Sequence, residues 1–416
     1  MKQRRVAITG LGLVSPYGGM DVDDFFARLC RKESAIRPLR TDDKPRPLAM
    51  PFVDCPGFDG DAVLGRPLAI LMDRFAQLAM ASAFAAWDDA GLARAASAED
   101  RDAWGCTWGT SLGGTMAFER GYREMWLNGR ERLPPTSVVI GMHNAANAHI
   151  SIQLGLGGIS MSHAVACASA SIAIGEAFRR VRSGEAPVMI TGGSDTPQAY
   201  GVARAWEALR VIAPGAGDSA ARACRPFAAD RQGLVLGEGG AALVLEDWER
   251  ARARGARIHA ELVGYGSSCD HSHLVKPDAG GQVRALRNTL ADAGLTAADI
   301  DYINAHGTAT AEGDPIEITA LKTVFGEHAE GLAVSATKSM HGHLLGAAGA
   351  IESIVTVLAL REQTAPPTAH LDTIDPGCTG VDHIREASAR PLRAALSNSF
   401  AFGGSNAVLA FRTAHP

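Results

Sequence analysis

Two stretches of the chain, one in each half, follow the same pattern. The first, "SHAVACASASIAIGEAFRRVRSGEAPVMI" (162–190), places Cys167 in a turn-like segment before a helix of small residues. The second, "VSATKSMHGHLLGAAGAIESIVTVLALREQTAPPT" (334–368), places His343 in the corresponding segment. An internal repeat of this kind predicts two similar halves that face each other and bring both side chains into one cleft. We place the halves at 1–254 and 255–416, divided just before "IHAELVGYG".

The whole chain alternates strand-like runs with helical patterns. The apolar runs are "RVAITG", "APVMITGGSD", "AALVLED", "IHAELVGYG", "DYINAHGT", "GLAVSATK", "RAALSNSF" and "NAVLAFR". Helical patterns cover 72–90, 171–182, 281–293 and 345–360. Strands that alternate with helices indicate βαβ units, so we predict an α/β protein whose sheet is covered by helices on both faces.

Composition excludes several classes of protein. The net charge of −5 and the lack of a basic block give no reason to expect nucleic acid. No stretch of about 18 apolar residues occurs, and no signal-peptide core follows the N-terminal "MKQRR", so we expect no membrane span and a cytoplasmic protein. The richest basic run, "ERARARGAR" (249–257), is predicted to be a solvated helix end.

The seven cysteines are scattered and never spaced as CxxC. This pattern indicates neither a disulfide framework nor a thiolate zinc site, and most of these thiols are expected to be small buried groups. Cys167 differs because it stands at the predicted start of a helix. There the helix dipole and free backbone N–H groups are expected to lower the pKa of its thiol, which would make it a nucleophile. A structural role is the alternative for any single cysteine.

Two histidines lie in loops that suit a site with the cysteine. His306 stands in "NAHGTATAEGD" (304–314) and His343 in "TKSMHGHLLGAAGAIES" (337–353), each after a strand-like run and among glycine, threonine and alanine. Such loops let the backbone approach a ligand. Lys338, in the loop before His343, could hold a carboxylate or tune the pKa of a neighbour. One shared site explains the similar surroundings of the cysteine and the two histidines better than three unrelated structural roles.

The sequence gives only weak evidence for a dinucleotide site or a metal site. "GLGLVS" (10–15) follows a strand but has Ser15 where the dinucleotide fingerprint has its third glycine, and Pro16 follows at once. "HSH" (271–273) and "HGH" (341–343) could be metal pairs, alone or with Cys167, but they lack a carboxylate or a third ligand at metal spacing.

Long motifs in a consistent order carry a resemblance to a known family. They are "RVAITGLGLVSPYG" (5–18), "VACASASIAIGEA" (165–177), "CRPFAADRQGLVLGEGGAALVLE" (224–246), "NAHGTATAEGDPIE" (304–317), "TKSMHGHLLGAAGAIES" and "SNSFAFGGSNAVLAF" (397–411). Through them nearly the whole chain resembles the elongating β-ketoacyl-acyl carrier protein synthases of the thiolase superfamily. The resemblance implies a five-layered αβαβα fold of two thiolase-like halves, a dimer, and decarboxylative condensation of malonyl carrier protein with an acyl chain.

The resemblance also implies roles for individual residues. Cys167, in the first half, would accept the acyl group. His306 and His343, in the second half, would bind the malonyl thioester and promote loss of its carboxylate. The other residues would support the histidines (Lys338, Glu352), contact the phosphopantetheine arm (Thr308, Thr310), gate the site (Phe400, Phe402), limit the acyl chain (Leu112) or shape the site (Asp314, Ala401). The family needs no metal or organic cofactor beyond the phosphopantetheine of its acyl carrier protein.

Three departures from the family pattern favour a specialised fatty-acid or polyketide-type pathway over primary fatty-acid synthesis. Ala401 replaces a usual glycine, His341 replaces a usual threonine, and "GRPLAIL" (65–71) replaces a segment that is often basic and contacts the carrier. Leu68, Ile70 and Leu71 in that segment either dock a partner or pack on the helix that follows. The alternatives are a chain-length-controlling partner subunit, which usually lacks the cysteine, and a coenzyme A thiolase, which would need a second cysteine near "FGGSN". Chain length, carrier, pathway and the choice between homodimer and heterodimer stay open.

Overall fold

One hydrogen-bonded sheet of 11 strands runs through this computed structural model, which describes residues 3–40, 46–94, 100–215 and 217–414. The strands form two groups that meet where β1 and β9 pair antiparallel, between Val6–Ile8 and Ala260–Leu262. The N-terminal group consists of β1 (Val6–Val14), β8 (Gly239–Asp247), β6 (Val188–Asp195), β4 (Gly105–Gly109) and β5 (Ser160–His163). The C-terminal group consists of β9 (Ala260–Cys269), β16 (Ser405–Arg412), β15 (Ala394–Phe400), β10 (Tyr302–Asn304), β11 (Ala333–Ser335) and β13 (Asp382–His383).

The two groups have the same topology. Outward from the junction, the first runs β1-β8-β6-β4-β5 and the second β9-β16-β15-β10-β11, with β13 added at its edge. In each group the first two pairings are antiparallel and the next two are parallel. The sequence repeat is therefore a repeat of structure.

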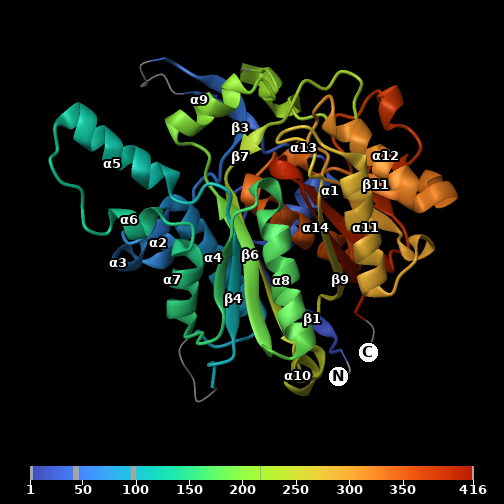
Figure 1. The fold of residues 1–416 in the computed structure, drawn as a ribbon, viewed down its shortest axis with the longest axis horizontal. Helices are drawn as coiled ribbons and strands as arrows, with labels where there is room; N and C mark the ends of the chain where they lie inside the picture. The colour runs from blue at the N-terminus through green and yellow to red at the C-terminus, as the bar shows by residue number, and fades with distance from the viewer. Residues whose placement is uncertain (1–2, 41–45, 95–99, 216, 415–416) are drawn as a thin grey trace.

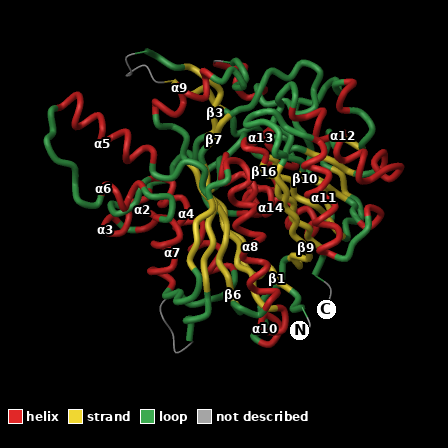
Figure 2. Tube along the Cα trace, in the orientation of Figure 1, coloured by secondary structure: helices red, strands yellow, loops and turns green. Residues whose placement is uncertain are grey.

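Helices divide the molecule into layers (Figures 1 and 2). The middle helices α8 (Ser169–Ser183) and α14 (Ala348–Glu362) contact strands of both groups. Outside the first group lie α4 (Arg74–Asp89) and α7 (Ala145–Leu154), and outside the second lie α11 (Ala279–Ala293) and α12 (Gly313–Phe325). This arrangement confirms the predicted five-layered αβαβα fold.

Predicted and observed elements agree where the pattern is long and apolar. All eight predicted strand-like runs contain strands, and the four predicted helices are α4, α8, α11 and α14. α14 begins later than predicted because Leu345–Ala347 form a separate 3-10 turn. α8 ends at Gly184, whose φ of +83° gives the left-handed cap that glycine adopts without strain.

Several elements carry no clear signal in the sequence. Besides β4, β5, β13, α7 and α12, they are α1 (Val22–Cys30), β2 (Arg37–Arg40), β3 (Ala49–Val53), α2 (Gly60–Leu64), α3 (Arg66–Ala69), α5 (Thr115–Asn128), α6 (Ser137–Gly141), α9 (Tyr200–Ala208), β7 (Leu236–Gly237), α13 (Lys338–His341), β12 (Thr364–Ala365) and β14 (Ser388–Ala389). β2, β3 and β7 form a small second sheet. Met50 and Phe52 of β3 belong to the apolar cluster that contains Cys167.

The basic run at 249–257 is only partly solvated, contrary to the sequence prediction. Arg250 and Arg254 both form ion pairs with Glu246, whose side chain is fully buried. Thr9 donates a further hydrogen bond to that carboxylate at 2.6 Å. A buried carboxylate is costly without such partners, so these arginines have a structural role. None of the helices in the described ranges combines the length and apolar character needed to cross a membrane.

Candidate active site

Cys167 lies in a 3-10 turn (Ala166–Ala168) that leads directly into α8. The Ser169 hydroxyl holds the turn, since it accepts from Val165 N at 2.8 Å and donates to Ala166 O at 2.7 Å. The cysteine is only 6% exposed. Burial raises the pKa of its thiol to about 12, although the Lys338 charge and the backbone N–H of Phe402 oppose the rise. The expected lowering of this pKa is therefore wrong, because desolvation outweighs the helix start.

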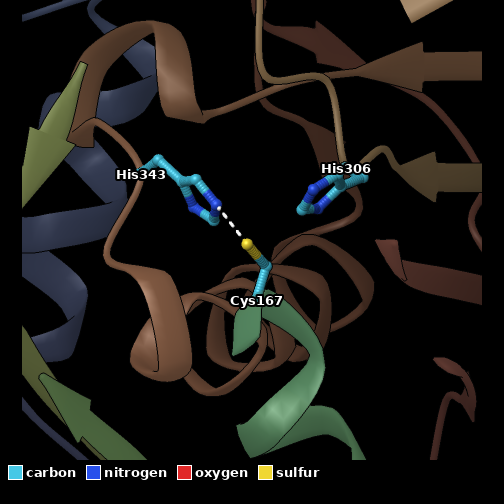
Figure 3. Close-up of side chains that lie close together, drawn as sticks. All are labelled: Cys167, His306 and His343. Atoms are coloured by element: carbon cyan, nitrogen blue, oxygen red, sulfur yellow. Dashed lines mark hydrogen bonds between the residues drawn. The ribbon is translucent and has the colours of Figure 1, made fainter. Parts of the chain in front are cut away.

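His343 and Cys167 are in direct contact (Figure 3). His343 Nε2 lies 3.0 Å from Cys167 Sγ, as the sequence repeat predicts. The backbone of His343 is fixed on both sides, because its N–H donates to Val235 O at 2.6 Å and its carbonyl accepts from Gly237 N at 3.0 Å. Burial and the Lys338 charge hold the pKa of His343 well below its usual value, so the ring is neutral.

His306 approaches the same sulfur from the loop after β10 (Figure 3). Its ring centroid lies 5.4 Å from that of His343, with the two planes nearly perpendicular. Lys338 Nζ lies 3.5 Å from His306 Nδ1. An ammonium can only donate, so Nδ1 accepts and the proton of this neutral ring belongs on Nε2. Burial, with Lys338 and His343 adding to it, holds the pKa of His306 well below its usual value.

A buried ion pair stands behind His306. Lys338 binds Glu352 of α14, and both side chains are fully buried. Burial raises the pKa of Glu352 to about 7, while the Lys338 charge opposes the rise. Lys338 and Glu352 thus lie where the resemblance implies, one contact away from the histidine.

Glu317 on α12 supports the His306 turn, and sequence reasoning missed it. Its carboxylate accepts from His306 N at 2.9 Å, from Gly307 N at 2.8 Å and from Asn398 Nδ2 at 3.0 Å. A Cβ on Gly307 would come within 2.4 Å of Ala336 Cβ, so the tight turn also needs glycine. Glu317 lies eleven positions after His306, and the sequence indicates their contact only once the helix α12, which carries Glu317, is recognised.

Asp195 was also missed, and it supports the cysteine side of the site. This buried carboxylate, at the end of β6, accepts from Ser111 N at 2.8 Å, from Leu112 N at 3.1 Å and from Gly346 N at 2.7 Å. It therefore ties the loop after β4 to the turn before α14. In the sequence, "GGSD" ends the predicted strand-like run "APVMITGGSD", and nothing nearby shows the partners of its acid.

A cavity of about 440 Å³ leads from solvent to the cysteine. The predicted residues that line it are Cys167, His306, Thr308, Thr310, Asp314, His343, Phe400, Ala401 and Phe402. The hydroxyls of Thr308 and Thr310 lie 3.2 Å apart. Phe402 stacks on Trp206 at a centroid distance of 5.9 Å. Ala401 has an extended backbone with φ −108°, so alanine causes no strain there.

Two predicted residues lie slightly apart from the reacting groups. Asp314 accepts a hydrogen bond from Phe227 N at 2.7 Å, and burial raises its pKa to about 7. This contact fits the structural role that the resemblance implies. Leu112 is half-buried and packs with the apolar cluster that contains Cys167, but it does not line the cavity.

The same three side chains could also hold a metal ion. Ligand atoms of Cys167, His306 and His343 all lie within 4.8 Å of one another, and no other group of three appears among the described residues. His341 turns away from this group toward Thr337, so the "HGH" pair does not converge.

Comparisons with known proteins identify the family. The model of the beta-ketoacyl synthase N-terminal domain matches residues 3–251, and that of the C-terminal domain matches 259–372. Nodulation protein E of Rhizobium sp. (strain N33) is 44% identical over 98% of this chain and 99% of its own length. The 3-oxoacyl-acyl-carrier-protein synthase 2 of Coxiella burnetii (strain RSA 493 / Nine Mile phase I) is 40% identical over 98% of both chains.

Solved structures agree with this assignment. "The ishigamide ketosynthase/chain length factor" matches with a TM-score of 0.89 and 32% identity, covering 99% of this chain and 100% of that one. A "type II PKS acyl-carrier protein in complex with its ketosynthase bound to the hexaketide" matches with a TM-score of 0.88 and 28% identity over the same shares. The fold and the buried Cys-His-His group are those of a condensing enzyme. The chain belongs to the β-ketoacyl synthase family and performs decarboxylative Claisen condensation.

We predict that Cys167→Ala abolishes acyl transfer to the protein, because only the thiol can form the thioester. The fold should survive, since the surrounding turn already consists of small residues. Mass spectrometry after incubation with an acyl carrier reads the adduct directly. An adduct that still forms at the parent rate would refute the assignment of the nucleophile.

We predict that His306→Ala and His343→Ala each lose malonyl decarboxylation by about 100-fold or more, because each removes one donor to the developing enolate. Both variants should still accept an acyl group on Cys167. Release of carbon dioxide from malonyl carrier measures the first step, and the intact mass measures the second. Unchanged release in both variants would contradict the assignment.

Proposed function

We propose that this chain elongates an acyl group held on Cys167 with malonyl units delivered by an acyl carrier protein, in a specialised fatty-acid or polyketide-type pathway. The observation that carries the proposal is the contact of His343 Nε2 with Cys167 Sγ at 3.0 Å, with His306 beside both. A nucleophile and two donors around one point suit a reaction that passes through an acyl-enzyme and an enolate.

In the first step, the Cys167 sulfur attacks the carbonyl carbon of the acyl thioester. A new C–S bond forms, the bond to the carrier sulfur breaks, and the thiol proton leaves with the carrier thiol. The backbone N–H groups of Cys167 and Phe402, which already face the sulfur, stabilise the oxyanion. Burial keeps this thiol protonated at neutral pH, so its proton passes to the carrier thiolate as the new C–S bond forms.

In the second step, malonyl thioester loses its carboxylate as carbon dioxide, and the electron pair of the broken C–C bond forms an enolate. Neutral His306 and His343 donate N–H groups to the enolate oxygen, and each such donor contributes about 3 kcal/mol. The enolate carbon then attacks the acyl group on Cys167, and the sulfur leaves. Lys338 keeps the His306 proton on Nε2, where it faces the site.

This chemistry needs no metal or organic cofactor of the protein's own. The acyl groups arrive on a phosphopantetheine arm, and the paired hydroxyls of Thr308 and Thr310 on the cavity wall suit its amide groups. Phe400 and Phe402 line the cavity together with the cysteine, and movement of their loop would gate access. The cytoplasmic location stays a prediction.

A specialised pathway is supported by the relatives and by the surface. Identity is 44% to a Nodulation protein E and 40% to a 3-oxoacyl-acyl-carrier-protein synthase 2. Ile70 and Leu71, in the segment that resembles a carrier contact, are 64% and 44% exposed, whereas Leu68 packs on the protein's own core. An apolar contact therefore replaces a basic one at this position.

We also propose that the chain pairs with itself. β5 is an edge strand with exposed Met161, and α5 has no buried residue although it carries exposed Trp126 and Leu127. The edge of β5 and the exposed apolar side chains on α5 are both features that suit an isologous interface. The structural match to a ketosynthase/chain length factor keeps a related partner subunit as the alternative, but Cys167 argues against this chain being the partner that lacks the cysteine.

Intact mass spectrometry with a panel of acyl and malonyl carriers tests the proposal. The protein should carry an acyl mass on Cys167 and release a product two carbons longer per malonyl unit. Failure of every acyl and malonyl carrier to acylate the protein or yield product would overturn it.

On the same panel, we predict that Leu112→Ala lengthens the longest accepted primer. The leucine packs in the apolar cluster around Cys167, and its truncation opens volume there. Its backbone N–H bond to Asp195 is unaffected, so acylation with short chains should be kept. A profile identical to that of the parent would place the length limit elsewhere.

We predict that carrier affinity falls by less than about tenfold between low and physiological salt, because an apolar contact is not screened. Replacing both Ile70 and Leu71 with lysine should steepen the salt dependence for an acidic carrier. Met20→Lys, at another partly exposed apolar residue, is the control. A parent affinity that already falls more steeply would count against apolar docking.

A further inference from the structure

His341 is a fully buried histidine outside the reacting group, and both of its ring nitrogens have partners. Nδ1 lies 2.9 Å from the carbonyl oxygen of Gly342, and Nε2 lies 2.9 Å from Thr337 Oγ1. A carbonyl can only accept, so the ring proton belongs on Nδ1. Nε2 therefore accepts from the Thr337 hydroxyl.

The same hydroxyl continues the chain of bonds. Thr337 Oγ1 accepts from Asn304 Nδ2 at 3.3 Å, and Asn304 is the last residue of β10, two positions before His306. All donors thus point one way, from Asn304 through Thr337 and His341 to the carbonyl of Gly342. This relay begins at the end of β10, two residues before His306, and ends on the carbonyl of the peptide that joins Gly342 to His343.

We infer that His341 is a positioning residue that sets the distance between His306 and His343. Gly342 has φ +66° and no Cβ, so the peptide before His343 has little rigidity of its own. The bond from His341 holds the carbonyl of that peptide, and the N–H of the same peptide, which belongs to His343, donates to the Val235 carbonyl. Because the two histidines must meet one enolate oxygen, a small change in their separation weakens both donors together.

Burial keeps His341 suited to this role. The ring packs against Phe25 at a centroid distance of 6.4 Å, and burial lowers its pKa to about 3, helped by the nearby Lys338 charge. The ring is therefore neutral across the working pH range, so Nε2 stays an acceptor.

The inference rests on the roles proposed for His306 and His343. The test measures the two half-reactions, acylation of Cys167 and decarboxylation of the malonyl group, separately. His341→Phe keeps a ring but removes both bonds, and Thr337→Val removes only the middle hydroxyl. Each should lower malonyl decarboxylation about tenfold or more. Acylation of Cys167 should change by less than about twofold, because the thiol lies outside the relay. The double variant should lose no more than either single one, since one chain is cut twice.

Two further variants separate positioning from general stability. His341→Asn places an amide N–H near the position of Nδ1, so it should recover part of the decarboxylation rate. Ser339→Ala removes two bonds on the same short helix, to the Ala336 carbonyl and from Ala369 N, without touching the relay. It should lower the Tm yet leave the ratio of decarboxylation to acylation unchanged.

The inference is overturned if His341→Phe and Thr337→Val keep the parent ratio, or if both half-reactions fall together in proportion to the Tm. Should His341→Phe fail to fold, Thr337→Val decides alone. His343→Ala, measured in the same assays, distinguishes a failure of the proposed histidine roles from a failure of the relay. If it keeps decarboxylation, the proposed histidine roles fail; if it loses decarboxylation while the relay variants do not, only the relay fails.

Discussion

The close approach of the two halves at the centre of the molecule is the constraint on which the rest depends. α8 and α14 pack between the two groups of strands, and their first turns meet at the site. A Cβ on Gly349 would lie 2.0 Å from Ser171 Oγ, and one on Gly346 would lie 2.4 Å from Ser111 N. Backbones this close leave room only for small residues. The run of alanine and serine around Cys167 is therefore what lets a cysteine from one half reach histidines from the other.

Burial then determines the electrostatics of the site. Desolvation raises the pKa of the Cys167 thiol and lowers those of His306 and His343, so all three are neutral at rest. The Lys338–Glu352 pair is costly in such surroundings, and pairs of this kind add little net stability. Its value lies in orientation, because an ammonium behind His306 fixes which nitrogen carries the proton.

The sequence predicts much of the fold because buried strands and helices of ordinary length have strong apolar patterns. It does not predict β4, "GCTWG", or β5, "SMSH", because small and polar residues interrupt the pattern although β4 is fully buried. In the site, Cys167 and the two histidines could be predicted from their similar loops and the family motifs. Asp195 and Glu317 could not, because their partners come from turns whose shape only the folded chain defines. The direction of the thiol pKa was wrong because a sequence reveals a helix start but not the depth of burial.

The placement of the supporting residues divides the work between the halves. Asp195 ties together the loops around the cysteine, whereas Glu317, Lys338 and the relay through His341 all act on the histidines. In the proposed mechanism, acyl acceptance needs the thiol and the backbone donors, while decarboxylation needs the two histidines. A chain built from two similar halves can therefore change its acyl substrate through residues near Cys167, such as Leu112, without disturbing the groups that generate the enolate. The departures at Ala401, on the cavity wall, and at the exposed Ile70 and Leu71 fit this division, because each lies where a substrate or carrier would be selected.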